Sequence, residues 1–301
     1  MKDTKYKGVI VPMISPLRSD YRVDVEAVGR IVSQFSKSGV HPFVGGTTGE
    51  VSGLSLEQKK DLVRATVEWR VPNQVVYASV SSNCLSDSLH MCELFAEMGA
   101  DVAVATLPSY YPLTELQAAR YMETLGEESV LPVIFYNIPA TTHWSIPLSL
   151  LNELSYHPNI VGLKDSERDL VRLDSAVELW KERNDFVYLL GWAAQSAHGL
   201  LKGADGIVPS TGNFAPQLYA DLYAAALSGD VDLLQVLQDK TNELGLIYQQ
   251  GRTLGESLVA LKVIMSELGL CETRVTSPLC EMGEQEELSY RKQLRTFCGI
   301  N

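Results

Sequence analysis

A chain of 301 residues is long enough to bury the core of one large domain, and its formal net charge at pH 7 is −12. This acidic balance disfavours a nucleic-acid partner, because a phosphate backbone is bound chiefly by lysine and arginine. Hydrophobic residues make up 46% of the chain, a share typical of globular proteins, and no apolar stretch is long enough to span a bilayer.

The first residues, Met1 to Lys7, lead into a strand-like segment without the apolar region or cleavage site of a signal peptide. The five cysteines are odd in number, form no C-x-x-C pair and lie in apolar segments. We therefore expect reduced thiols in the core and a cytoplasmic protein.

Strand-like and helix-like segments alternate along the first three quarters of the chain. Eight apolar runs recur at the spacing of βα units, at residues 8–15, 42–46, 75–80, 101–106, 132–137, 160–164, 186–191 and 206–210. Helical patterns separate them at residues 55–69, 87–98, 114–127, 170–182, 192–201 and 216–227, and the first begins with a capping-box pattern, Ser55 to Gln58.

This alternation predicts an α/β fold, a (β/α)8 TIM barrel over residues 1–229. Residues 230–301 have only helical patterns, and we expect a C-terminal helical extension packed on the barrel. The alternative is an open doubly wound sheet. That fold usually has a glycine-rich phosphate loop after its first strand, and residues 11–16 (Val-Pro-Met-Ile-Ser-Pro) do not form one.

Lys164 follows the apolar run of residues 159–163, where a buried strand does not ordinarily place an ammonium ion. The preceding run, residues 131–135, is followed directly by Tyr136. Because side chains alternate along a strand, Lys164 and Gly162 should point one way and Val161 and Leu163 the other. Tyr136 and Ile134 should likewise oppose Val133 and Phe135, so the amine and the phenol meet inside the barrel.

Each residue also has a simpler interpretation. A lysine at a strand end more often reaches solvent or pairs with a carboxylate, here Asp165, and a lone tyrosine is more often a core aromatic. If Lys164 is instead buried, desolvation lowers its pKa, and a neutral amine can add to a ketone to form a Schiff base.

The segment after the second predicted strand, residues 45–50, reads Gly-Gly-Thr-Thr-Gly-Glu. Small residues around two hydroxyls suit a backbone nest that offers N–H and O–H donors to a carboxylate. The same composition is also common in a tight turn before a helix. The segment lacks the lysine of a phosphate-binding P-loop.

Five motifs are similar, in order and over essentially the whole chain, to those of the dihydrodipicolinate synthase and N-acetylneuraminate lyase family, the pyruvate-dependent Schiff-base aldolases. They are residues 46–50 (Gly-Thr-Thr-Gly-Glu), 108–112 (Pro-Ser-Tyr-Tyr-Pro), 136–139 (Tyr-Asn-Ile-Pro), 162–165 (Gly-Leu-Lys-Asp) and 203–206 (Gly-Ala-Asp-Gly).

The resemblance implies a role for each site residue. Lys164 would form the imine with pyruvate or another 2-keto acid, and Tyr136 would move a proton to and from the substrate together with Thr47. It implies further that Thr47 and Thr48 hold the keto-acid carboxylate, that Val208 offers a backbone carbonyl near the imine, and that Tyr110 completes the relay across a subunit interface. The implied partners are pyruvate and an aldehyde, with neither a cofactor nor a metal, in a homotetramer built as a pair of dimers.

The chain departs from the family pattern around the acceptor. Dihydrodipicolinate synthases carry an arginine two residues beyond the proline of the Tyr-Asn-x-Pro motif, where this chain has Thr141, and the usual Thr-Gly that follows is Thr142-His143. N-acetylneuraminate lyases place an Asp-Glu pair after the seventh strand, where this chain has Trp192 and two alanines. A loop histidine such as His143 is more often solvated or structural, so it stays outside the expected catalytic set.

Residues 212–217 (Gly-Asn-Phe-Ala-Pro-Gln) are similar to the 2-keto-3-deoxy sugar acid aldolases of the same family, which release pyruvate and an aldehyde. We therefore expect this activity. Dihydrodipicolinate (4-hydroxy-tetrahydrodipicolinate) synthase and N-acetylneuraminate lyase are the alternatives.

Two rival functions lie outside this class. A metal-dependent aldolase would need clustered ligands, and the five histidines are scattered without an H-x-H or H-E-x-x-H motif. A barrel that only binds keto acids would have lost its chemistry. The presence of Lys164, Tyr136 and both threonines argues against that loss.

Overall fold

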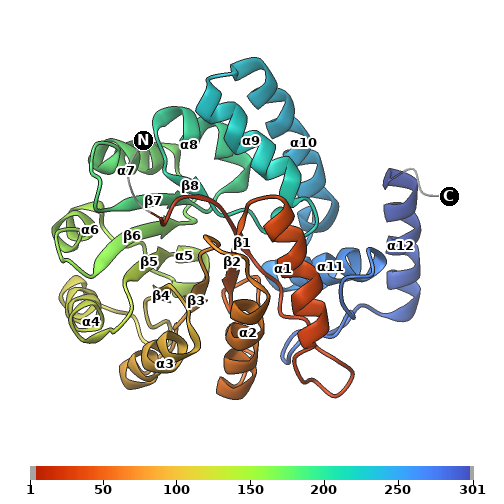
Figure 1. Ribbon diagram of the computed structural model, residues 1–301, viewed down its shortest axis with the longest axis horizontal. Helices are drawn as coiled ribbons and strands as arrows, with labels where there is room; N and C mark the ends of the chain where they lie inside the picture. The colour runs from red at the N-terminus through yellow and green to blue at the C-terminus, as the bar shows by residue number, and fades with distance from the viewer. Residues whose placement is uncertain (1–4, 299–301) are drawn as a thin grey trace.

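The computed structural model describes residues 5–298. Within them, eight parallel strands form a closed barrel in which β1 pairs with both β2 and β8 (Figure 1). The strands are β1 (Gly8–Pro12), β2 (His41–Val44), β3 (Tyr77–Ser79), β4 (Val102–Thr106), β5 (Val133–Asn137), β6 (Ile160–Asp165), β7 (Val187–Leu190) and β8 (Gly206–Ile207). The predicted TIM barrel is confirmed.

Helices connect the strands and surround the barrel (Figure 1). They are α1 (Val25–Lys37), α2 (Leu56–Trp69), α3 (Leu85–Met98), α4 (Glu115–Glu128), α5 (Pro139–Thr142), α6 (Leu148–Leu154), α7 (Leu170–Trp180), α8 (Ser196–Lys202) and α9 (Pro216–Ser228), with the 3-10 turns η1 (Ala193–Gln195) and η2 (Ser210–Asn213). The capping box of α2 forms as predicted. The helix predicted at residues 192–201 begins later, because η1 occupies its first turn.

The apolar side chains form two cores, as expected when strand residues alternate between two faces. An inner core fills the barrel and includes Ile134 and Tyr136. An outer core lies between the strands and the helices and includes Val133, Phe135 and Leu163. The predicted alternation is therefore confirmed for these five residues.

Val161 does not follow this alternation. It packs against the inner core, although Leu163 lies in the outer one. Val133 pairs with Ile160 and Ile134 pairs with Gly162, so the register between β5 and β6 shifts by one residue at Val161. A bulge of this kind places an extra residue in one strand, and the simple two-residue period fails there.

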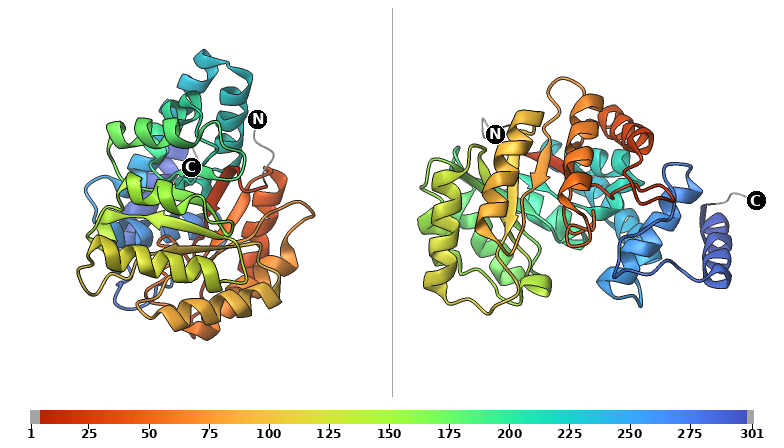
Figure 2. Two further views of the ribbon diagram at one scale, coloured as in Figure 1. Left: turned by 90° about the vertical axis from the view of Figure 1, so that its left-hand side faces the viewer. Right: turned by 90° about the horizontal axis from the view of Figure 1, so that it is seen from below.

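The segment after α9 is helical, as predicted. Helix α10 (Val231–Gln249) packs on α8 and α9, while α11 (Leu254–Glu267) and α12 (Glu284–Cys298) lie to one side of the barrel (Figure 2). The proposed division between residues 229 and 230 falls between α9 and α10, and a separate domain there stays a prediction. Along the described part of the chain, no helix combines the length and apolar character that a bilayer span needs.

The cysteines correct one expectation. Cys92 and Cys271 are buried, but Cys84 and Cys280 are exposed, and all four are free thiols. Cys84 is the N-cap residue of α3, and Cys280 lies in the connection between α11 and α12. Both therefore belong to surface connections. Polar residues adjoin them, Asn83 before Cys84 and Glu281 after Cys280, so the expected apolar segments are not present at these two positions. The side chain of Cys298 lies outside the described part.

Candidate active site

Lys164 and Tyr136 lie side by side inside the barrel. They are register partners on β6 and β5, and each residue is 5% exposed. The Lys164 Nζ atom is 3.6 Å from the centre of the Tyr136 ring and 4.8 Å from that of Phe43. An amine is therefore held against two aromatic rings.

Burial lowers the pKa of Lys164 below its ordinary value, and the neighbouring Tyr136 phenol partly opposes this shift. Within residues 5–298, Lys164 forms no ion pair. Asp165 instead forms an ion pair with Arg172, with 2.7 Å between Oδ2 and Nε. Burial thus makes the neutral, nucleophilic amine more accessible for Lys164 than for an exposed lysine.

Ser166 is a site residue that the sequence analysis missed. Its Oγ donates a hydrogen bond to the Tyr136 phenol oxygen at 3.3 Å. Gly191 makes room for this hydroxyl, because a Cβ atom at residue 191 would lie 2.1 Å from Ser166 Oγ. The only available signal was the alternation itself, which points residues 162, 164 and 166 toward the same face.

Thr47 and Thr48 lie in the turn that follows β2. The Glu50 N–H donates to the Thr47 carbonyl, and the Val51 N–H donates to that of Gly46. Gly45 has φ of 64°, a conformation that glycine adopts at little cost. Across the described residues, no hydrogen bond joins the Thr47 hydroxyl to Tyr136 or Tyr110.

Tyr110 lies on the protein surface in the connection between β4 and α4. Its side chain is 76% exposed and packs edge-on against Tyr111, with ring centres 4.9 Å apart. The Oδ1 atom of Asn83 accepts hydrogen bonds from the Ser109 and Tyr110 N–H groups. The backbone of this segment is therefore fixed while both rings face outward.

Val208 belongs to the inner core, directly after β8. Its N–H donates to the Leu190 carbonyl at 2.8 Å, which continues the pairing of β7 and β8 by one residue. Val208 therefore lies at the same end of the barrel as Lys164, because parallel strands end on one face.

The residues at which the chain departs from the family pattern lie after β5 and β7. Thr141 lies in α5, where its hydroxyl donates to the Ile138 carbonyl at 3.3 Å. His143 is exposed and ends this helix with φ of 59°. Trp192 follows β7 and packs against the outer core. The Thr141 side chain is uncharged, so this position offers only neutral polar groups.

The comparisons with known proteins agree with this fold. The model of the dihydrodipicolinate synthetase family matches residues 5–297. An uncharacterised DapA-like lyase of Thermofilum pendens is 32% identical over 264 residues, which are 87% of this chain and 88% of that protein.

Two solved structures are similar over nearly their whole length. The dihydrodipicolinate synthase of Bacteroides thetaiotaomicron is 30% identical with a TM-score of 0.90, covering 96% of this chain and 98% of that one. A protein of the same family from E. coli K12, solved in complex with pyruvate, is 25% identical with a TM-score of 0.90, covering 97% and 99%.

The chain belongs to the dihydrodipicolinate synthetase family. This confirms the resemblance in its motifs and the prediction of a class I, pyruvate-dependent aldolase or lyase.

Proposed function

We propose that Lys164 attacks the keto carbon of pyruvate and forms an imine with loss of water. The observation that carries this proposal is the burial of a lysine against Tyr136 and Phe43, with no carboxylate partner among the described residues. The imine then withdraws electrons from the neighbouring carbon, so a carbon–carbon bond to an aldehyde can form or break there. The pyruvate complex of the E. coli relative supports the choice of keto acid.

Tyr136 is the proposed proton carrier. Its phenol adjoins Lys164 and accepts a hydrogen bond from Ser166. Thr47 and Thr48 are proposed to hold the carboxylate, and the Val208 carbonyl to face the imine. A proton path from Tyr136 through Thr47 needs a rotation of the threonine hydroxyl or a bound water, because the two side chains do not bond directly within the described residues.

The proposed reaction is cleavage or synthesis of a 2-keto-3-deoxy sugar acid. The uncharged Thr141 and the Ser166 hydroxyl support a neutral, hydroxylated aldehyde as the second substrate. A second candidate, condensation of pyruvate with aspartate semialdehyde, is favoured by the activity in the name of the B. thetaiotaomicron relative. Against it stands the absence of a cation at residue 141, since a carboxylate that leaves water needs charged or multiple donors.

Oligomerisation belongs to the same proposal. Tyr110 and Tyr111 form an exposed aromatic pair, and large exposed aromatics often mark protein interfaces. We propose a homotetramer in which Tyr110 reaches the site of a neighbouring subunit. A variant dissociated to folded monomers should lose activity, and a fully active monomer would contradict this part.

The protein is proposed to work in the cytoplasm. The four described cysteines are free thiols, which fits a reducing compartment. Fractionation of cells that produce the protein tests this location.

Borohydride reduction in the presence of pyruvate tests the central step. Reduction should inactivate the protein and leave a stable adduct on Lys164 alone, identified by peptide mass spectrometry. Lys164→Met is the matched variant that should remain unlabelled. Labelling of another lysine, or no labelling, refutes the imine. The same preparation should then be assayed for pyruvate release from 2-keto-3-deoxy acids and from sialic acid, and for dihydrodipicolinate formation.

A further inference from the structure

Glu50 closes the Gly-Thr-Thr-Gly-Glu motif, yet nothing in the proposed chemistry uses it. It is buried and has φ of 60°. Residues with a side chain seldom adopt this left-handed conformation, and it persists where the surroundings hold it in place. The contacts of Glu50 therefore show what holds this turn.

The Glu50 carboxylate is bound entirely by the C-terminal part of the chain. Its Oε2 atom accepts hydrogen bonds from the N–H and the hydroxyl of Thr276, at 2.6 and 2.9 Å. Its Oε1 atom lies 2.5 Å from the Lys262 ammonium, and both side chains are 1% exposed. This second contact is electrostatic, because Oε1 has no well-aligned hydrogen bond.

Lys262 extends the connection further. It lies on α11, and its ammonium also donates a short hydrogen bond to the Arg274 carbonyl. One buried pair of charges thus joins three segments: the turn after β2, helix α11 and the connection that follows α11.

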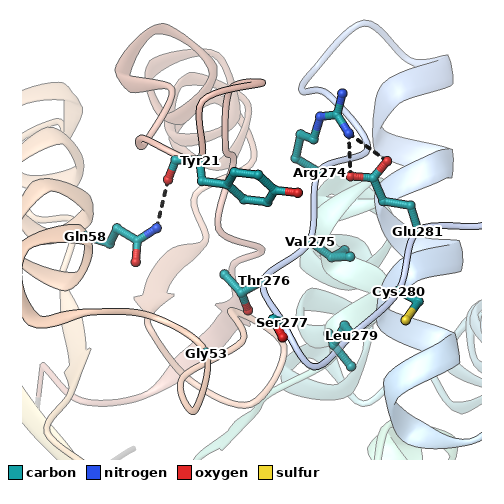
Figure 3. A pocket seen from close by; sticks show the side chains of 10 residues that line it. All are labelled: Tyr21, Gly53, Gln58, Arg274, Val275, Thr276, Ser277, Leu279, Cys280 and Glu281. Carbon is teal, nitrogen blue, oxygen red and sulfur yellow. Dashed lines mark hydrogen bonds and ion pairs between the residues drawn. The ribbon is translucent and has the colours of Figure 1, made fainter.

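The turn is held on its other side as well. The Ser15 hydroxyl donates to the Gly49 carbonyl at 2.6 Å. Gly53 packs so closely on Thr276 that a Cβ atom there would lie 2.0 Å from the threonine hydroxyl. Figure 3 shows Gly53 and Thr276 beside each other. The turn is therefore clamped between the segment after β1 and the C-terminal connection.

A cleft of about 600 Å³ opens beside this contact, between the arm that carries Tyr21 and the connection from Arg274 to Glu281 (Figure 3). None of the residues that line it belongs to the proposed site.

We propose that Glu50 and Lys262 are positioning residues for substrate binding: their buried ion pair fixes the turn that presents Thr47 and Thr48 to the keto-acid carboxylate. This inference rests on the proposed function, because it takes pyruvate as the ligand of those threonines. It also gives the C-terminal region a role in the site, although that region contributes no group to the chemistry.

The charge of this pair supports a role of Glu50 and Lys262 in positioning the turn after β2. Apolar residues of similar volume often stabilise a protein as well as a buried ion pair does, and breaking such a pair leaves one charge uncompensated. Movement of the turn would separate the buried Glu50 carboxylate from Lys262 and from both Thr276 donors and leave its charge uncompensated, so this arrangement opposes displacement of the turn.

The test compares single and double variants with the parent. Glu50→Gln and Lys262→Met each leave one buried charge unpaired, whereas the double variant removes both charges. Thr276→Val removes one hydroxyl donor and is the mildest change. Arg291→Met is the control: it breaks the ion pair of 2.6 Å with Glu267 that ties α12 to α11, in the same region but away from the turn.

Two quantities separate positioning from stability. We expect the KM for pyruvate to rise about tenfold or more in Glu50→Gln, Lys262→Met and the double variant, and about threefold in Thr276→Val, because donors to the carboxylate move out of place. The kcat at saturating pyruvate should change less. Arg291→Met should lower the melting temperature and leave the KM for pyruvate unchanged.

The outcomes are distinguishable. If borohydride and pyruvate label Lys164 in the parent, but the folded double variant and Thr276→Val keep the KM of the parent, the positioning role is wrong and the proposed function stands. If the parent is not labelled at Lys164, the proposed function fails and this inference fails with it. If Arg291→Met raises the KM equally, general loosening of the C-terminal region explains the effect, which overturns the specific role of Glu50.

Discussion

Asn137 donates a hydrogen bond of 2.9 Å to Asp165, and the two residues directly follow Tyr136 and Lys164 on adjacent strands. Asp165 also pairs with Arg172 at 2.7 Å. Because neighbouring residues of a strand face opposite ways, this polar pair lies behind the amine and the phenol. It holds the ends of β5 and β6 together at the point where the proposed chemistry occurs.

Asp165→Ala should therefore destabilise the protein strongly. Among the described residues, the substitution leaves the largely buried Arg172 guanidinium with Glu167, at 3.3 Å, as its one charged partner. Loss of one member of a buried pair typically costs about 3–5 kcal/mol. Urea denaturation measures the change in the free energy of unfolding. Asp185→Ala, which breaks a pair whose carboxylate is 71% exposed, should cost about 1 kcal/mol or less. Equal costs for the two variants would contradict this interpretation.

The pH dependence of imine formation should follow Lys164. Burial lowers its pKa, so the neutral amine becomes available at a lower pH than for an ordinary lysine. The rate of borohydride trapping should therefore rise with pH and level off below pH 10.5, the ordinary value for this group. The Tyr136 phenol raises the pKa of Lys164. In Tyr136→Phe, the rise of the trapping rate with pH should therefore occur at lower pH. If the trapping rate levels off only at or above the ordinary lysine pKa, burial does not lower the pKa of Lys164.

Tyr136→Phe should also separate imine formation from proton transfer. The variant keeps the Lys164 nucleophile and the aromatic ring but lacks the hydroxyl, and loss of a general acid–base group typically lowers turnover by roughly 100-fold or more. We expect that loss in steady-state assays together with a normal yield of trapped adduct. Ser166→Ala is a milder variant for comparison with Tyr136→Phe, because it keeps the phenol and removes only the hydrogen bond to it. Unimpaired turnover in Tyr136→Phe would remove the tyrosine from the mechanism.

Thr141→Arg should shift acceptor preference toward aspartate semialdehyde. The parent has a hydroxyl where a guanidinium would bind the carboxylate through two hydrogen bonds, and a charge-assisted contact of this kind changes kcat/KM by about a hundredfold. Comparing kcat/KM for aspartate semialdehyde and glyceraldehyde in parent and variant decides the matter. Thr142→Arg is the positional control. Efficient dihydrodipicolinate synthesis by the parent would overturn the substrate proposal and leave the imine untouched.

Much of this arrangement could be predicted because it depends on local periodicity. Alternating βα patterns predict the barrel, and a two-residue period places Lys164 and Tyr136 on one face without knowledge of any contact. Val161 is where that argument fails, since a bulge depends on the partner strand as well as on the strand itself. The expectation of a buried thiol is wrong for Cys84 and Cys280 for a different reason: polar residues such as Asn83 and Glu281 adjoin them, and such residues are typical of surface connections.

Other features of the site could not be predicted, because no pattern in the neighbouring sequence indicates them. The ion pair of Glu50 and Lys262 joins residues that are distant in the chain, and neither residue has sequence neighbours that indicate its partner. Ser166 depends on a glycine at residue 191, on another strand connection. Such relationships arise only when the closed barrel brings the strand ends together.

The clamp on the turn after β2 also constrains the order in which the protein can mature on the ribosome. Residues 45–50 are synthesised early, yet the groups that hold Glu50 belong to residues 262 and 276. A nascent chain released at residue 229 would contain the eight strands of the described barrel, Lys164 and both threonines, but its turn would keep the Ser15 contact and lack the groups that bind Glu50. Competence to bind the keto acid should therefore arise late in synthesis, after the barrel itself has closed.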